Sequence, residues 1–130
     1  MSFLECVREE LKFLVSTYFF EETIIAPNCV RYTSSSVTLE AVYSDRAEID
    51  LIVDENPPTR RFQYALYLKL YYPSVAKGLG YGIATHDEEI CREVKALAAT
   101  LRLYGEPILR HDVGVFSRIK SYIVGIRGES

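Results

Sequence analysis

Hydrophobic and polar positions alternate along two neighbouring stretches in the first half of the chain. Apolar residues occupy every second position from Val37 to Tyr43 and again from Ala47 to Val53. This period-two pattern is typical of strands with one buried face. A connection through residues 44–46 pairs Tyr43 with Ala47 and Val37 with Val53, so every pair on the buried face is apolar. A shift of one residue would destroy that match.

The opposite face of this hairpin carries acidic residues. In the predicted register Glu40 lies opposite Asp50, and Glu48 lies opposite Val42. Like charges that face each other across two strands destabilise a sheet. Two interpretations remain open. Either the nearby Arg31 and solvent relieve the repulsion, or the acidic face binds a cationic partner.

A further strand precedes the hairpin. A turn at Ser34–Ser35 places Tyr32 beside Val37 and Val30 beside Leu39. Upstream, the β-branched stretch 23–26 also suits an extended conformation, and Pro27-Asn28 follows it as a turn signal. The sequence therefore predicts a three-stranded antiparallel meander, or a four-stranded one if residues 23–26 join it.

A helix is predicted before the sheet, over residues 3–18. Its apolar residues, from Phe3 to Tyr18, recur at helical spacing. Ser2 is a suitable N-cap, and Glu5 three residues later completes a capping box. This helix should cover the sheet.

Two more helices are predicted near the end of the chain. Thr85 and Glu88 form a second capping box, and an apolar stripe follows from Ile90 to Leu101. Gly105 ends this helix. A shorter helix should follow, capped by Asp112 and burying the apolar residues Val113, Phe116 and Ile119.

The middle of the chain is ambiguous. Residues 59–72 alternate like a strand, but Thr59 as an N-cap, the Ala and Leu content and the following Pro73 favour a helix. The glycine-rich loop Gly78–Gly82 lacks the spacing of phosphate-binding loops, so we expect a connector or a binding loop there. Several tyrosines surround this loop in the sequence: Tyr64, Tyr67, Tyr71, Tyr72 and Tyr81. Tyrosine suits both a core roof and a protein-binding surface.

Taken together, these elements predict one α+β domain over residues 1–130. The antiparallel meander is covered by the N-terminal helix and the C-terminal helices. No apolar run reaches the roughly 20 residues of a membrane span. The start of the chain lacks the pattern of a signal peptide, so we expect a cytoplasmic protein. Cys6, Cys29 and Cys91 then read as small buried residues in a reducing compartment, not as a disulfide framework.

Charge is distributed unevenly along the chain, although the net charge is only −3. Residues 1–58 carry eleven Asp and Glu against four Lys and Arg, whereas residues 59–130 carry seven against eleven. An acidic first half argues against nucleic acid as a partner, and the basic residues of the second half are scattered.

Candidate catalytic chemistry is sparse. His86 and His111 are too few for a metal site, and no G-x-S-x-G elbow exists. Glu40, Glu48 and Asp50 could form a carboxylate dyad, but carboxylates on a strand face are more often solvated. We therefore expect no enzyme, no metal and no cofactor.

Several stretches resemble small bacterial α/β proteins associated with immunity to polymorphic toxins and contact-dependent inhibition. The resemblance lies in Phe3, Leu11 and Phe13-Leu14, in Val30-Arg31-Tyr32 with the serines after it, in Asp45–Ile49, and in Leu97-Ala98 through Tyr104-Gly105 to Leu109–Asp112. Residues 59–84 match no pattern of that group. Immunity proteins act by binding and blocking a toxin, so the resemblance implies a protein partner and no catalytic residues.

The leading hypothesis is thus a protein-binding module, specifically an immunity protein that neutralises a cognate toxin. Candidate partner-binding residues are Glu40, Glu48, Asp50, Tyr67, Tyr71, Tyr72 and Tyr81. The alternatives are a small-ligand binder or small enzyme using residues 78–82, and a self-associating structural subunit. The sequence leaves the oligomeric state open.

Overall fold

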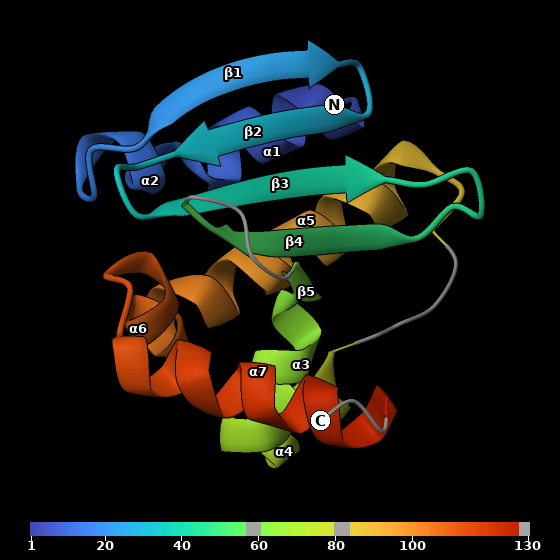
Figure 1. The fold of residues 1–130 in the computed structure, drawn as a ribbon. Helices are drawn as coiled ribbons and strands as arrows, with labels where there is room; N and C mark the ends of the chain where they lie inside the picture. Colours follow the sequence, from blue (N-terminus) through green and yellow to red (C-terminus); the bar gives the residue numbers. More distant parts are fainter. Residues whose placement is uncertain (57–60, 80–83, 128–130) are drawn as a thin grey trace.

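The fold is an antiparallel sheet packed against helices, as seen in a computed structural model that describes residues 1–56, 61–79 and 84–127. Within these ranges five strands pair in the order β1-β2-β3-β4-β5, so each strand lies beside its neighbour in sequence (Figure 1). The strands are β1 Glu21–Ala26, β2 Cys29–Thr33, β3 Val37–Tyr43, β4 Ile49–Glu55 and β5 Phe62–Gln63. The predicted α+β class is confirmed, and the sheet gains β1 and β5 beyond the three-stranded meander.

Helices cover one face and one end of the sheet. They are α1 Phe3–Glu10, α2 Lys12–Ser16, α3 Tyr64–Tyr71, α4 Pro73–Gly78, α5 Asp87–Tyr104, α6 Glu106–Leu109 and α7 Val113–Arg127. Helices α1 and α5 lie behind the sheet, whereas α3, α4 and α7 gather beyond β4 and β5 (Figure 1). None of the helices in the described ranges is both long and apolar enough to cross a lipid bilayer.

The core lies between the sheet and these helices. Tyr32, Leu39 and Val53 on the inner face of the sheet are fully buried, as are Leu14 on α2 and Leu101 on α5. The period-two pattern therefore identified the buried face correctly.

The first helix begins as predicted and ends earlier. The backbone N–H of Glu5 donates to Ser2 Oγ at 3.3 Å, and the N–H of Ser2 donates to Glu5 Oε1 at 3.1 Å. The capping box is confirmed. Leu11 leaves the helical conformation, with φ −101° and ψ 9°, and divides the predicted helix into α1 and α2.

The hairpin register differs from the prediction by two residues. Tyr43 pairs with Ile49, and Glu40 pairs with Ile52 instead of Asp50. The same shift on the other side places Arg31 directly opposite Glu40. The cause is a longer turn, in which Ser44 N–H donates to Glu48 O at 2.9 Å and Ala47 adopts a left-handed φ of 62°. The predicted Glu40–Asp50 repulsion does not exist.

The middle segment combines both interpretations that the sequence left open. Phe62 and Gln63 form the short strand β5, and a helix then runs over Tyr64–Tyr71. The helical interpretation is thus confirmed for most of the segment. The proposed cap Thr59 lies outside the described residues.

The C-terminal helices begin and end differently from the prediction. Helix α5 starts at Asp87 with His86 at the N-cap, so Thr85 is not the cap. Asp112 does cap α7, because the N–H of Val115 donates to its Oδ1 at 3.2 Å. However, α7 continues to residue 127 and leaves Val113 64% exposed. Phe116 and Ile119 are buried as predicted, and α6 is an additional short helix.

The cysteine prediction is wrong for two of the three cysteines. Cys6 on α1 and Cys91 on α5 form a disulfide across 85 residues of sequence, with 5.6 Å between their Cα atoms. The two helices pack side by side, which sequence spacing alone could not reveal. Cys29 is a free thiol of intermediate burial.

Candidate functional site

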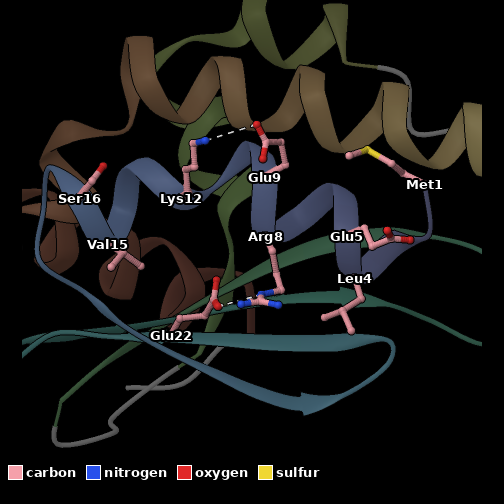
Figure 2. A pocket seen from close by; sticks show the side chains of 9 residues that line it. All are labelled: Met1, Leu4, Glu5, Arg8, Glu9, Lys12, Val15, Ser16 and Glu22. Atoms are coloured by element: carbon pink, nitrogen blue, oxygen red, sulfur yellow. Dashed lines mark hydrogen bonds and ion pairs between the residues drawn. The ribbon is translucent and has the colours of Figure 1, made fainter.

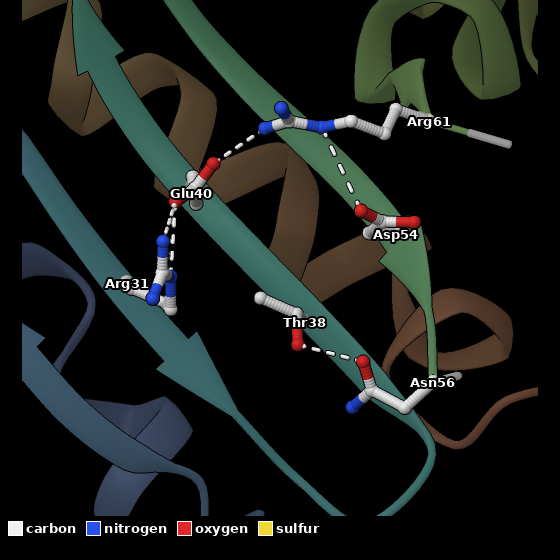
Figure 3. Close-up of polar contacts among 6 residues, drawn as sticks. All are labelled: Arg31, Thr38, Glu40, Asp54, Asn56 and Arg61. Carbon is white, nitrogen blue, oxygen red and sulfur yellow. Dashed lines mark hydrogen bonds and ion pairs between the residues drawn. The ribbon is translucent and has the colours of Figure 1, made fainter. Parts of the chain in front are cut away.

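Glu40 lies at the centre of an ion cluster on the outer face of the sheet (Figure 3). Arg31 donates to its Oε2 through Nε at 3.0 Å and through Nη2 at 2.8 Å. Arg61 donates to the other oxygen, Oε1, at 2.5 Å. The Glu40 side chain is only 13% exposed. Its charge is therefore matched within the chain, and this part of the face is not a free acidic surface.

The same cluster lines an open pocket of about 360 Å³. Arg61 Nε lies 3.6 Å from Asp54 Oδ2, and the Thr38 hydroxyl donates to Asn56 Oδ1 at 2.9 Å. The second oxygen of Asp54 is buried and accepts no hydrogen bond from the described residues. The pocket is thus lined by the Asp54 carboxylate and by two guanidinium groups.

Glu48 and Asp50 lie away from Glu40, with Glu48 in the turn between β3 and β4 and Asp50 at the start of β4. Asp50 pairs with Val42 across the strands. Burial raises the pKa of the Asp50 carboxyl, and the nearby charge of Glu48 raises it further. At this end of the molecule the N–H of Ala84 donates to Ala47 O at 3.0 Å, which brings the approach to α5 against the turn.

The predicted tyrosines separate into core and surface. Tyr67 is 1% exposed, and its hydroxyl donates to Tyr104 O at 2.5 Å, so it packs in the core and presents no surface. Tyr71 is half-buried, with the guanidinium of Arg118 4.5 Å from its ring centroid. Tyr72 is 37% exposed and lies against Tyr104, with 4.8 Å between ring centroids. Tyr81 lies outside the described residues, as do residues 80–83 of the glycine-rich loop.

A second surface, around α6, gathers exposed apolar and aromatic side chains. We call it the α6 surface: Tyr18, Phe19, Tyr72, Leu103 and Arg110. Phe19 is 84% exposed and Leu103 is 74% exposed. Arg110 lines two neighbouring pockets, one shared with Tyr72 and Leu103 and the other with Tyr18 and Phe19. The Arg110 guanidinium lies 5.1 Å from the ring centroid of Tyr18.

Two residues beside the α6 surface have unusual backbone conformations. Phe19 has φ 61° and His111 has φ 56°, in the left-handed region that glycine favours. Both line the same pocket. The N–H of Phe20 donates to Leu14 O at 2.9 Å, and the N–H of Asp112 donates to Pro107 O at 2.8 Å. Non-glycine residues in this region cluster at functional sites, which makes this pocket a candidate.

His111 is part of an ion cluster that ties α6 and α7 to the sheet. Its Nε2 lies 2.5 Å from Glu55 Oε2, and Lys120 forms an ion pair with the other oxygen of Glu55. The His111 ring also packs edge-on against Phe116, with 4.9 Å between centroids. Among the described residues, no group of three or more metal-ligating side chains converges.

Phe19, Leu103 and Arg110 were not among the candidate partner-binding residues predicted from the sequence. Leu103 carried a weak signal, because it falls outside the buried stripe of α5 that Val94, Ala98 and Leu101 define. The exposure of Phe19 follows from its backbone conformation, and the second of the two adjacent phenylalanines, Phe20, is buried.

Comparison of the chain with protein-family models, with curated proteins and with solved structures gives no match.

Proposed function

We propose that the protein is a protein-binding module that docks its partner on the α6 surface. The observation that supports the proposal most strongly is the exposure of Phe19. This residue is 84% exposed, and its backbone is held at φ 61°. Interface hot spots are enriched in aromatic residues and arginine. Phe19 and Arg110 supply both kinds of group, and Leu103 adds exposed apolar area beside them.

The partner that we propose is a bacterial toxin domain, which the protein neutralises by direct binding. This specific role rests on the resemblance of residues 3–14, 30–36, 45–49 and 97–112 to immunity proteins. The expected cytoplasmic location belongs to the same proposal. The Cys6–Cys91 disulfide weighs against that location, because disulfides persist mainly in oxidising compartments.

The distribution of acidic groups bears on how a basic partner would approach. Glu9, Glu22 and Glu40 form ion pairs within the chain, with Lys12, Arg8 and the Arg31–Arg61 pair respectively. Glu48 lies instead in the β3–β4 turn, and Asp50 lies at the start of β4. This end of the sheet is far along α5 from α6 (Figure 1). We therefore expect the end of the molecule with Glu48 and Asp50 to attract a basic partner over a distance, and the α6 surface at the other end to bind it.

The test is co-expression with the product of the neighbouring gene. We expect a stable complex on size-exclusion chromatography and survival of cells that make the toxin. Phe19→Gly and Arg110→Glu should each weaken the complex at least about tenfold, which is typical of removing a hot-spot group. Val113→Gly, which removes another exposed apolar side chain at the start of α7, is the control and should bind normally.

Two results would overturn the proposal. Absence of both a complex and protection would remove the immunity role. A complex that tolerates Phe19→Gly and Arg110→Glu would show that the partner docks elsewhere.

The alternative of a ligand site at residues 78–82 stays a prediction, because most of that loop lies outside the described residues. The pocket around Glu40 on the outer face of the sheet is a second candidate location for a ligand site. Its specific feature is Asp54, whose Oδ1 is buried without a hydrogen-bond donor among the described residues. Calorimetric titration of Asp54→Asn and of the parent protein with a small-molecule panel would test this: a ligand of the parent that the variant does not bind would support the site.

A further inference from the structure

The free edge of the sheet and the helix beside it form a groove. Strand β1 is the end strand of the order β1 to β5, so one of its edges lacks a neighbouring strand among the described residues. Helix α1 runs beside this edge, and the groove between them has a volume of about 650 Å³ (Figure 2). Ile24 and Ile25 on β1 are each 46% exposed.

We propose that a second copy of this chain fills the groove, so that two copies pair through β1 and α1 about a two-fold axis. The axis is perpendicular to the sheet. It joins the two β1 strands antiparallel, and it places the two α1 helices antiparallel on the same side of a continuous ten-stranded sheet. Exposed strand edges are templates for this kind of pairing.

The charges along the free flank of α1 favour antiparallel pairing of two copies. Glu5, Arg8 and Glu9 of α1 and Lys12 at the start of α2 line the groove (Figure 2). Their signs in chain order are negative, positive, negative and positive. Reversing the direction of the helix inverts every sign, so the flank is complementary to an antiparallel copy of itself. Glu5 then faces Lys12 of the second copy, and Arg8 faces Glu9.

Apolar residues frame these charges. Leu4 lies at one end of the groove and Val15, which is 40% exposed, lies at the other. The same two-fold axis places the Leu4 end of one copy beside the Val15 end of the other. A self-complementary arrangement of this kind is what a two-fold interface requires.

Strand β1 is compatible with the same axis. Because Ile25 is the extra residue of a bulge, antiparallel pairing that places Glu21 opposite Ala26 places Glu22 opposite Ile24, so that no two carboxylates face each other. Glu22 is already held by Arg8 Nε at 3.0 Å and by the Tyr32 hydroxyl at 2.9 Å. The β1–β2 register shifts between Ile24 and Ala26, which leaves Ile25 without a partner on β2.

The first measurement is sedimentation of the full chain over a range of concentrations. We expect a monomer–dimer equilibrium that weakens as salt is added, because the cross-copy charge pairs lie near solvent. A chain that stays monomeric at all concentrations would overturn the proposal.

A charge-swap variant then locates the interface. Glu9→Lys combined with Lys12→Glu keeps the net charge and the ion pair between the end of α1 and the start of α2, yet it sets like charges against each other across the axis. We expect at least a tenfold weaker dimer. The matched control is Glu106→Arg with Arg110→Glu, which inverts an exposed pair of α6 and should dimerise normally. A swap variant that dimerises like the parent would overturn the proposal.

A second variant gives a test that loss of folding cannot imitate. Glu5→Lys with Arg8→Glu inverts the other half of the charge pattern and should also fail to self-associate. Mixed with the first variant, it presents opposite charges at all four positions, so the two should form a heterodimer. Circular dichroism confirms that each variant is folded before mixing. Folded variants that stay monomeric in the mixture would overturn the antiparallel arrangement.

A third variant tests the strand contribution. Ile25→Lys places a charge on the β1 edge, a device by which edge strands avoid pairing. We expect it to weaken the dimer as well. A dimer of undiminished strength in this variant would overturn the pairing of the two β1 strands.

Discussion

At the scale of single residues, Phe19 is the clearest case of a position that costs stability. A left-handed backbone costs a non-glycine residue about 1–2 kcal/mol. Burial of the ring does not offset this cost, since the side chain is 84% exposed. The conformation is imposed by the chain around it, where the N–H of Phe20 bonds to Leu14 O.

Replacing Phe19 with glycine should therefore raise the free energy of unfolding, by about 1 kcal/mol. Urea denaturation of the variant and the parent measures the difference. Leu103→Gly is the control, because it also removes an exposed apolar side chain but from a helical backbone, and it should lower the free energy by up to about 1 kcal/mol. If the free energy of unfolding fell equally in Phe19→Gly and Leu103→Gly, the backbone of Phe19 would not be strained.

Asp50 should make stability depend on pH. Burial and the nearby charge of Glu48 raise its pKa above the ordinary value of an aspartate, so the folded state favours the protonated form. Stability from this group is therefore highest below the unfolded pKa and falls as pH rises through the folded pKa. Asp50→Asn should melt at a higher temperature than the parent at pH 7, and the difference should vanish near pH 3. If folding instead stabilised the charged carboxylate, thermal melts would show the opposite result, with Asp50→Asn melting at a lower temperature than the parent at pH 7.

At the scale of elements, the hairpin shows what a sequence pattern can and cannot specify. The alternation from Val37 to Val53 determines which face is buried, because a shift of one residue would exchange the faces. A shift of two residues preserves the alternation, so the pattern cannot distinguish the predicted register from the observed one. The turn decides between them, and its left-handed residue is Ala47, which has no sequence preference for that conformation.

The junction of α5 and α6 depends on the lack of a side chain at Gly105. A Cβ atom there would lie 2.5 Å from Leu101 Cδ1 and 2.6 Å from Leu101 O. Because the backbone oxygen cannot move freely, Gly105→Ala should lower the free energy of unfolding by about 1–3 kcal/mol. Gly125→Ala on α7 is the control, since nothing lies within 4 Å of its Cβ position. It should be neutral or stabilising by up to about 1 kcal/mol in chemical denaturation.

At the scale of the whole molecule, the sequence predicted the class of fold better than the surface. Capping boxes and alternation rest on contacts between residues close in sequence, and those predictions largely succeeded. Arg61 beside Glu40, Arg110 above Tyr18 and Cys6 beside Cys91 depend on how distant elements pack. The α6 surface is assembled from four separate segments for the same reason.

The disulfide should contribute strongly to stability, because it closes a loop of 85 residues. Loop-closure entropy for this length corresponds to about 4.6 kcal/mol. Cys91→Ala should therefore lower the free energy of unfolding by roughly that amount, and dithiothreitol should do the same to the parent. Cys29→Ala, which removes the free thiol, should retain the response to dithiothreitol. A parent protein whose denaturation midpoint ignores the reductant would contradict the cross-link.

The order of strands also has a consequence during synthesis on the ribosome. Strands β1 to β4 span residues 21–55 and pair only with sequence neighbours, so they can associate as soon as they emerge. Helix α5, which covers the inner face beside α1, ends at Tyr104 and is made almost fifty residues later (Figure 1). The nascent sheet thus spends that interval with α1 as its main cover, and its exposed apolar face is a natural substrate for chaperones.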